Sequence, residues 1–301
     1  MKKLFATLII MAYSAVAANA QLLYRISGAG LGKASYVFGT FHIASAQFAE
    51  KAAGVRQALD ETSQVYGEIR WDNMTNPDSL KAMQTAMTLP GGQTLRQTLK
   101  PETYQKLDKT VTELMGVGLG NPVVEQQLGR LKPAVLTTQL QMLMYMKNHM
   151  GEFDPTNTID QYFQTQAKNN SEPVGGLETL SFQAGLLYGG DLKRQTALLE
   201  CLLDNAEYYT QLMERMGKAY YAQDINTLHD IMDEKLSATC DATPEEKAEL
   251  IDNRNKRWAE KMPAIMAERP TLFVVGAGHL PGQRGLIALL QEKGYTVEAV
   301  K

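Results

Sequence analysis

The sequence lacks several features that would assign it at once to a common class of protein. Acidic residues slightly outnumber basic ones, 33 to 30, so nothing suggests binding to nucleic acid or to an anionic membrane. No apolar run reaches the roughly 18 residues of a membrane-spanning helix. The His-Glu-x-x-His pattern of many zinc proteases and the Gly-x-Ser-x-Gly pattern of serine hydrolases are both missing. Any hydrolytic site must therefore use another arrangement.

The first twenty residues have the pattern of a secretory signal peptide. Two lysines at positions 2 and 3 precede the apolar run Leu4 to Val16, and Ala18-Asn19-Ala20 is a small-x-small cleavage pattern. The mature chain is expected to begin at Gln21, which is not the cysteine that a lipoprotein needs. We predict a periplasmic or secreted protein without a transmembrane helix. Loss of two of its 30 basic residues leaves 28 against 33 acidic ones, a net charge of −5.

Only two cysteines are present, Cys201 and Cys240. Neither has another cysteine or a histidine at ligand spacing, so thiol or metal chemistry is the weaker interpretation. In an exported chain, such a pair most simply forms one disulfide. It would close a loop of about 40 residues, worth about 4 kcal/mol on the chain-entropy model.

Strand patterns lie near both ends of the chain, whereas helical periodicity fills the middle. This distribution predicts an α/β protein with a central mixed sheet built from the N- and C-terminal segments. One domain over residues 21–301 would then carry a helical insertion at roughly 77–170 and 180–268. The expected strands are Leu22 to Ser27, Ser35 to Thr40, Gln64 to Arg70, Pro173 to Gly176, Thr271 to Gly276 and Tyr295 to Val300.

Long helical runs are expected between these strands. A group of methionines within one of them, Met142, Met144 and Met146, invites a copper or cofactor interpretation. However, positions two apart do not share one helical face, so helix packing explains them better. The expected helices include Pro101 to Met115, Pro133 to Met150, Thr158 to Lys168, Leu192 to Ala222 and Pro244 to Ala267.

Two of the four histidines close the same pattern, Gly-x-x-His, where a strand-like run ends. The first is Gly39-Thr-Phe-His42 and the second is Gly276-Ala-Gly-His279. Loops at the carboxyl ends of parallel strands converge over one edge of an α/β sheet, where ligands bind. We therefore expect His42 and His279 to face one site. The alternative is two structural histidines.

Three further charged residues, Glu68, Glu178 and Arg254, occupy positions where an ion-pair or metal partner is expected. Glu68 lies in the apolar run Val65 to Ile69, where an unpaired carboxylate is costly. Glu178 is expected at the start of a helix beside the sheet edge. Arg254 shares a helical face with Trp258, so it is expected to point inward, while Arg257 faces solvent. A metal ion or an arginine could satisfy each carboxylate, and a structural ion pair or a charged helix face remains the alternative.

Together these motifs resemble the TraB/GumN family, which is related to the TIKI proteases and more distantly to erythromycin esterases and a haem-binding group. The resemblance spans nearly the whole mature chain. It implies a sheet core with a helical insertion and, as in TIKI members, a metal-dependent peptidase that uses the two Gly-x-x-His histidines and a glutamate. The matching elements are Gly39-Thr-Phe-His42, Tyr-Gly-Glu68, Gly-Leu-Glu178-Thr, Arg254-Asn255 and Val-Gly-Ala-Gly-His279-Leu-Pro-Gly282.

The resulting hypothesis is a divalent metal, zinc, manganese or cobalt, held by His42 and His279. Glu68 or Glu178 would be the third ligand or the general base, and the ligand set that we favour contains Glu68. Arg254 or Asn255 would stabilise the oxyanion. Two alternatives are an exported protein that binds haem or a metal without catalysis and an inactive peptide-binding scaffold.

Overall fold

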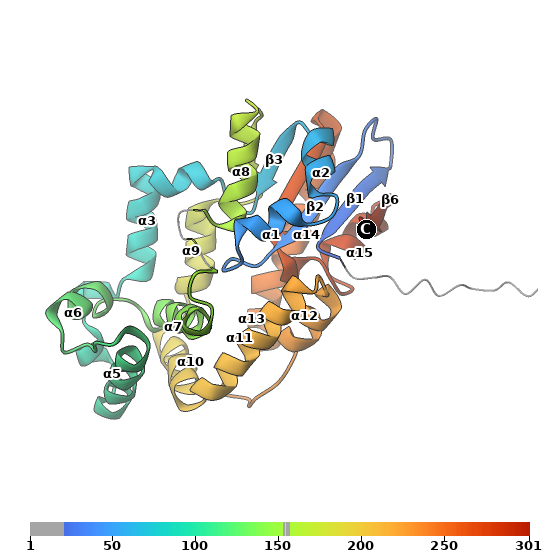
Figure 1. The fold of residues 1–301 in the computed structure, drawn as a ribbon. Coiled ribbons are helices and arrows are strands. Elements are labelled where there is room, and N and C mark those ends of the chain that lie inside the picture. The colour runs from blue at the N-terminus through green and yellow to red at the C-terminus, as the bar shows by residue number, and fades with distance from the viewer. Residues whose placement is uncertain (1–20, 153, 155–156) are drawn as a thin grey trace, which may run out of the picture.

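The computed structural model describes residues 21–152, 154 and 157–301, and the predicted signal peptide lies outside them. One six-stranded mixed sheet forms the centre, in the order β4-β3-β5-β2-β1-β6 (Figure 1). The predicted fold class is confirmed, and the strand expected at Pro173 to Gly176 joins the sheet as β4. The strands are β1 Leu23–Gly28, β2 Ser35–Thr40, β3 Gln64–Gly67, β4 Val174–Gly176, β5 Thr271–Gly276 and β6 Tyr295–Ala299.

Four neighbouring strands, β4, β3, β5 and β2, run parallel, so their carboxyl ends meet at one edge. The two remaining strands pair antiparallel, β1 with β2 and with β6. All six residues of β2 are buried, as expected of a strand whose two faces are covered by helices. The sheet therefore forms the core and presents a single edge of converging loops.

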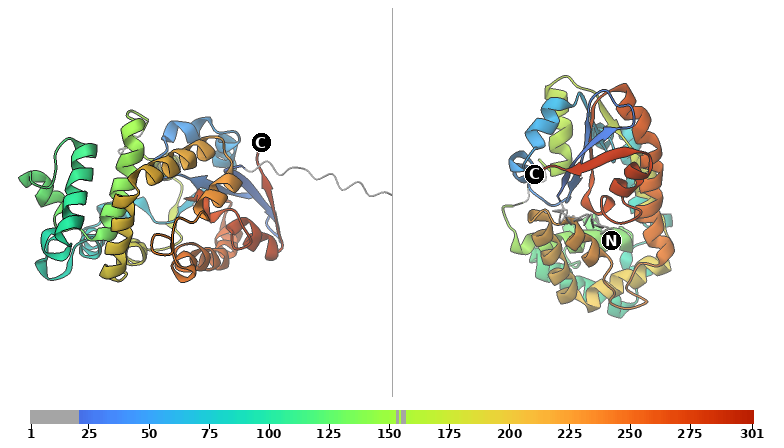
Figure 2. Two further views of the ribbon diagram at one scale, coloured as in Figure 1. Left: turned by 90° about the horizontal axis from the view of Figure 1, so that it is seen from below. Right: turned by 90° about the vertical axis from the view of Figure 1, so that its right-hand side faces the viewer.

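Helices cover both faces of the sheet and fill most of the chain between β3 and β5 (Figure 2). They are α1 Ala46–Lys51, α2 Val55–Glu61, α3 Pro77–Met87, α4 Leu95–Thr98, α5 Pro101–Met115, α6 Pro122–Leu128, α7 Pro133–Asn148, α8 Ile159–Asn169, α9 Leu180–Tyr188, α10 Leu192–Asp204, α11 Ala206–Tyr221, α12 Ile225–Met232, α13 Pro244–Lys247, α14 Asn253–Glu268 and α15 Leu286–Glu292. Short 3-10 turns lie at Trp71–Thr75, Pro90–Gly92 and Ala277–His279, and a π-helical turn lies at Ala248–Asp252.

The helices α1, α2 and α8 lie on one face of the sheet, and α14 and α15 lie on the other (Figure 2). Phe163 of α8 packs against Phe38 of β2 with ring centroids 4.9 Å apart. From the opposite side, α14 contributes Trp258 and Met262 to the same core. Farther from the sheet, α4, α5, α6, α7 and α10 enclose a second apolar cluster that includes Leu107. Within the described residues, no helix is long and apolar enough to cross a membrane.

Most predicted helices match the structure to within two residues, but the run Leu192 to Ala222 divides at Asn205 into α10 and α11. The backbone of Asn205 leaves the helical region at φ −127° and ψ 34°, and its side-chain amide donates to the Cys201 carbonyl. This local bonding competes with helix continuation. Met144 is buried in the second cluster, as the helix-packing interpretation of the methionines predicted.

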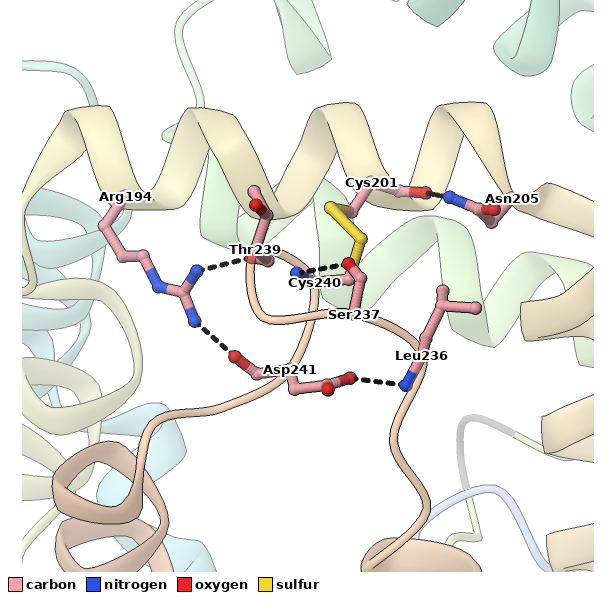
Figure 3. The surroundings of a disulfide bond; sticks show 8 residues. All are labelled: Arg194, Cys201, Asn205, Leu236, Ser237, Thr239, Cys240 and Asp241. Atoms are coloured by element: carbon pink, nitrogen blue, oxygen red, sulfur yellow. Dashed lines mark hydrogen bonds between the residues drawn. A yellow bond between two sulfur atoms is a disulfide. The ribbon is translucent and has the colours of Figure 1, made fainter.

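The predicted disulfide between Cys201 and Cys240 is confirmed, with Cα atoms 5.5 Å apart (Figure 3). It ties α10 to the loop that precedes α13. Arg194 reinforces this tie by donating to the carbonyl oxygens of Thr239 and Asp241, both at 2.6 Å. It also forms an ion pair with Glu246.

Replacement of both cysteines by serine is expected to lower the free energy of unfolding by about 2–4 kcal/mol, because the unfolded chain regains loop freedom. Urea unfolding of the oxidised protein and of the double variant measures the difference. The unmodified protein with its disulfide reduced, which keeps both sulfur atoms, controls for the serine substitution itself. Equal unfolding midpoints would show that the Arg194 contacts hold the loop without the disulfide.

His149 follows α7 and lies between two carboxylates, Glu214 at 2.8 Å and Glu152 at 3.1 Å, with its ring stacked on Tyr145. The hydrogen bond to Glu214 raises the pKa of His149 above its ordinary value.

The contribution of protonated His149 to stability should be complete below the unfolded-state pKa of about 6.5 and be lost as pH rises through the higher folded-state pKa. His149→Gln should remove this pH-dependent decrease in the free energy of unfolding, which we expect to be about 0.2–1 kcal/mol. Unfolding curves at pH 6 and pH 9 test it, and equal pH dependence in both proteins would contradict it.

Candidate functional site

The predicted site residues lie where the four parallel strands end. His42 follows β2, Glu68 follows β3, Glu178 follows β4, and His279 closes the turn after β5. Two details differ from the prediction. Glu68 lies just beyond its strand instead of inside it, and Glu178 precedes the N-cap Thr179 of α9 instead of starting the helix. Both carboxylates therefore belong to the loops over the sheet edge.

His42 is held by a carboxylate from α8. Its Nδ1 lies 2.8 Å from Asp160 Oδ2, and the other oxygen of Asp160 accepts a hydrogen bond from the Thr40 hydroxyl at 2.7 Å. The charge of Asp160 raises the pKa of His42 to about 9. The His42 side chain is 69 % exposed and lines a cleft over the sheet edge. With Nδ1 bound to Asp160, Nε2 is the nitrogen left for a ligand, and a metal would bind there by replacing the proton that a ring of this pKa carries at pH 7.

His279 is buried and held by Asn255. The Asn255 amide nitrogen donates to the carbonyl oxygens of His279 and Arg284, which directs Asn255 Oδ1 at His279 Nδ1, 2.7 Å away. Because the amide oxygen of Asn255 can only accept a hydrogen bond, a neutral His279 ring must carry its proton on Nδ1. Burial lowers the pKa of His279 to about 4, so the ring is neutral at pH 7. Its Nε2 lone pair accepts a hydrogen bond from Arg254 Nη1 at 2.9 Å.

Arg254 lies at the centre of the site and is only 4 % exposed. Its Nη2 donates to Glu68 Oε2 at 2.5 Å and to Glu178 Oε1 at 2.7 Å. Its Nε also donates to Glu178, and its Nη1 donates to His279 and to the Leu250 carbonyl oxygen. These contacts use all five N–H groups of the guanidinium. Two buried carboxylates and one buried histidine are thus held by a single arginine.

The ring of Trp258 supports this arginine from the next turn of α14. The guanidinium carbon lies 4.6 Å from the Trp258 ring centroid, which is a favourable cation–π contact. The π-helical turn just before α14 supplies the Leu250 carbonyl, and such turns occur often at functional sites. Arg257 was predicted to face solvent, but it is half-buried over the ring of Phe182. The flexible stem of Arg257 allows its guanidinium to lie against this aromatic ring, a contact that the helical pattern does not predict.

Glu68 is nearer than Glu178 to the histidines. Its Oε1 lies 3.7 Å from His279 Nε2 and accepts a hydrogen bond from the Gly276 N–H at 2.8 Å. Burial opposes ionisation of Glu68, but His279 and the Arg254 guanidinium lower its pKa to about 2. Glu68 is therefore a carboxylate at every physiological pH.

The donor types around Gly276 are those of a transition-metal site. A Cβ at Gly276 would lie 3.3 Å from Glu68 Oε1 and 4.0 Å from His42 Nε2, so glycine leaves this space open. Each histidine has its Nδ1 bound to an oxygen, which is the usual support for a ligating ring. However, among the described residues, no three histidine, cysteine or acidic side chains are arranged so that they could hold one metal ion together. An ion on His279 Nε2 would displace the hydrogen bond from Arg254.

Two contributors to this site were not predicted from the sequence. Asp160 lies in the first turn of α8, where an acidic residue is ordinary. Gln183 of α9 donates to Glu68 Oε2 at 2.9 Å and to Glu178 Oε1 at 3.1 Å. Neither carries a local sequence signal, because only the fold brings α8 and α9 to the sheet edge.

Fold and site together define an α/β protein with a histidine and carboxylate site at the carboxyl edge of a parallel sheet. The chain belongs to the TraB/PrgY/gumN family, whose model matches residues 22–299. It is 26 % identical to Metalloprotease TIKI1 of Danio rerio over 88 % of this chain and 60 % of that protein. It is 22 % identical to the Metalloprotease TIKI homolog of Nematostella vectensis over 89 % of this chain and 65 % of that protein.

The human Metalloprotease TIKI1 is 24 % identical over 88 % of this chain and 59 % of the relative. The chain thus spans about 60 % of the length of these curated relatives. No solved structure matches the chain. The family resemblance drawn from the motifs is confirmed.

Proposed function

We propose that this protein is an exported, metal-dependent hydrolase that cleaves peptide bonds. The observation that carries this proposal is that Glu68, His279 and His42 all lie beside Gly276, with both histidine Nδ1 atoms already bound to oxygen atoms. The relatives named metalloproteases support peptide hydrolysis. The N-terminal pattern and the disulfide support export to an oxidising compartment.

In this proposal, Nε2 of both histidines and the Glu68 carboxylate would hold the metal. When bound, a divalent ion supplies a water of lowered pKa and a Lewis acid for the scissile carbonyl. Zinc, manganese and cobalt are all compatible with these donors. A pKa of about 2 makes Glu68 a weak general base at neutral pH, so its role as a ligand is the better supported one.

Arg254 has a second role in the same proposal. All its N–H groups are engaged in the structure, and release of His279 Nε2 would free one N–H of Nη1. That group would then stabilise negative charge that develops on the substrate carbonyl oxygen. Asn255 was an alternative for this role, but its amide N–H groups are bound to two backbone carbonyls. In this proposal, Asn255 therefore orients His279, and the oxyanion role is assigned to Arg254.

Hydrolysis of a defined peptide mixture tests the proposed function. The mature chain is incubated with zinc, manganese or cobalt, and products are identified by mass spectrometry. Cleavage should require one of these ions, stop with chelator, and be absent in His279→Ala. His149→Ala is the matched control, because its ring lies outside the site. Cleavage that survives both chelator and His279→Ala would contradict the proposal.

A second candidate function is non-catalytic binding of haem or a metal. The specific observation in its favour is that His42 lines a cleft with largely apolar walls. Titration with haem distinguishes the two functions. A Soret band that disappears in His42→Ala, without any peptide cleavage, would favour the binding protein.

Asp160→Asn is expected to weaken metal binding about 10- to 100-fold, which is the usual cost of losing the outer partner of a ligating histidine. The amide keeps the shape of the side chain but removes the charge that faces His42 Nδ1. Calorimetric titration of zinc into chelator-treated protein measures the affinity, with Asp78→Asn, exposed in the first turn of α3 and outside the cleft, as the control. Unchanged affinity would show that Asp160 does not support a ligand.

A further inference from the structure

The walls of the cleft over the sheet edge differ sharply from its floor. The floor holds the charged residues Glu68, Asp160 and Arg254, which are bound to one another or to the histidines. The walls are apolar and come from helices distant in the sequence. Side chains lining them include Met74, Met83, Leu180, Leu187, Met216, Met232, Leu250 and Ile251. The cleft volume is about 570 Å³, within the ordinary range for ligand sites.

The mouth of the cleft is apolar, as are its walls. Leu187, Leu250 and Met232 line it, and these side chains are 42 %, 38 % and 36 % exposed. They come from α9, the π-helical turn and α12. Large apolar side chains exposed together beside a polar floor mark a binding surface more strongly than single exposed leucines do.

We propose that these walls bind bulky, uncharged side chains next to the scissile bond of an extended peptide, so that the substrates are apolar polypeptide segments. This assignment rests on the proposed function. Glu68, Asp160 and Arg254 are already paired within the cleft, so a charged substrate side chain beside them would lose its hydration without gaining a partner. Methionine is flexible and polarisable, which lets such walls accept leucine, methionine and phenylalanine alike.

The four cleft methionines provide a direct probe that does not depend on hydrolysis. The metal-free mature chain, labelled with ¹³C at the methionine methyl groups, is titrated with blocked hexapeptides of sequence Gly-Gly-Leu-Phe-Gly-Gly or Gly-Gly-Glu-Lys-Gly-Gly. The apolar peptide should shift the signals of Met74, Met83, Met216 and Met232. Met150, which is 86 % exposed and outside the cleft, is the internal control. Binding of the charged peptide should be at least about tenfold weaker.

Two surface variants extend the test to the mouth. Leu187→Lys and Leu250→Lys should each weaken binding of the apolar peptide about tenfold, whereas Val123→Lys should not, because exposed Val123 lies on α6 away from the cleft. Equal binding of both peptides, or shifts of Met150 alone, would overturn the assignment. Selective binding without any metal-dependent cleavage would support the apolar cleft and refute the proposed hydrolysis, so the two failures are distinguishable.

Discussion

Replacement of Arg254 by methionine is expected to lower the free energy of unfolding by about 3–5 kcal/mol, the usual cost of removing one partner of a buried ion pair. Methionine keeps much of the length and the apolar stem but leaves Glu68 and Glu178 without a counter-ion. These carboxylates are 9 % and 6 % exposed, so solvent cannot replace the guanidinium. Urea unfolding followed by circular dichroism measures the change.

The effect of the unpaired charges on stability can be separated from the effect of lost side-chain packing. Glu68→Gln and Glu178→Gln, added to Arg254→Met, remove the uncompensated charges and should restore a large part of the lost stability. Lys256→Met is the matched control on the exposed side of α14 and should change stability by less than about 0.5 kcal/mol. A loss for Arg254→Met no larger than that of Lys256→Met would mean that the carboxylates are not buried as described.

Glu68→Gln is expected to reduce metal-dependent peptide cleavage by more than about 100-fold, since loss of an outer partner alone costs about 10- to 100-fold. The amide is nearly isosteric, and it still accepts the hydrogen bond from the Gly276 N–H. What it loses is the negative charge that faces His279 and Arg254. Initial rates at saturating zinc, manganese or cobalt measure the effect.

Glu50→Gln is the control for this second result, because Glu50 is exposed on α1 and outside the cleft. Metal content must be measured in both variants, so that a lost ligand can be distinguished from a lost general base. Cleavage by Glu68→Gln within about threefold of the unmodified protein would remove Glu68 from the proposed mechanism.

The sheet and the two histidine turns were predictable because their signals are local. An apolar strand followed by Gly-x-x-His can be recognised in eight residues, and β2 and β5 begin and end as predicted. Their parallel pairing is then enough to place His42 and His279 at one edge. The inward orientation of Arg254 follows from its helical spacing with Trp258, and both side chains are buried.

The contacts within the site were not predictable from such signals. Asp160 reaches His42 across 118 positions of sequence, and Arg254 reaches Glu68 across 186. No local pattern distinguishes Asp160 from an ordinary acidic residue in a first helical turn. The sequence also left open which glutamate lies nearer the histidines, since that depends on the order of β4, β3 and β5 in the sheet.

The most direct test of the shared metal site is elemental analysis of residues 21–301, purified without a histidine tag or chelators, beside His42→Ala and His279→Ala. We expect close to one equivalent of zinc, manganese or cobalt in the unmodified protein and its loss in both variants. No bound metal after reconstitution and dialysis, or equal metal content in all three proteins, would contradict a site shared by His42 and His279.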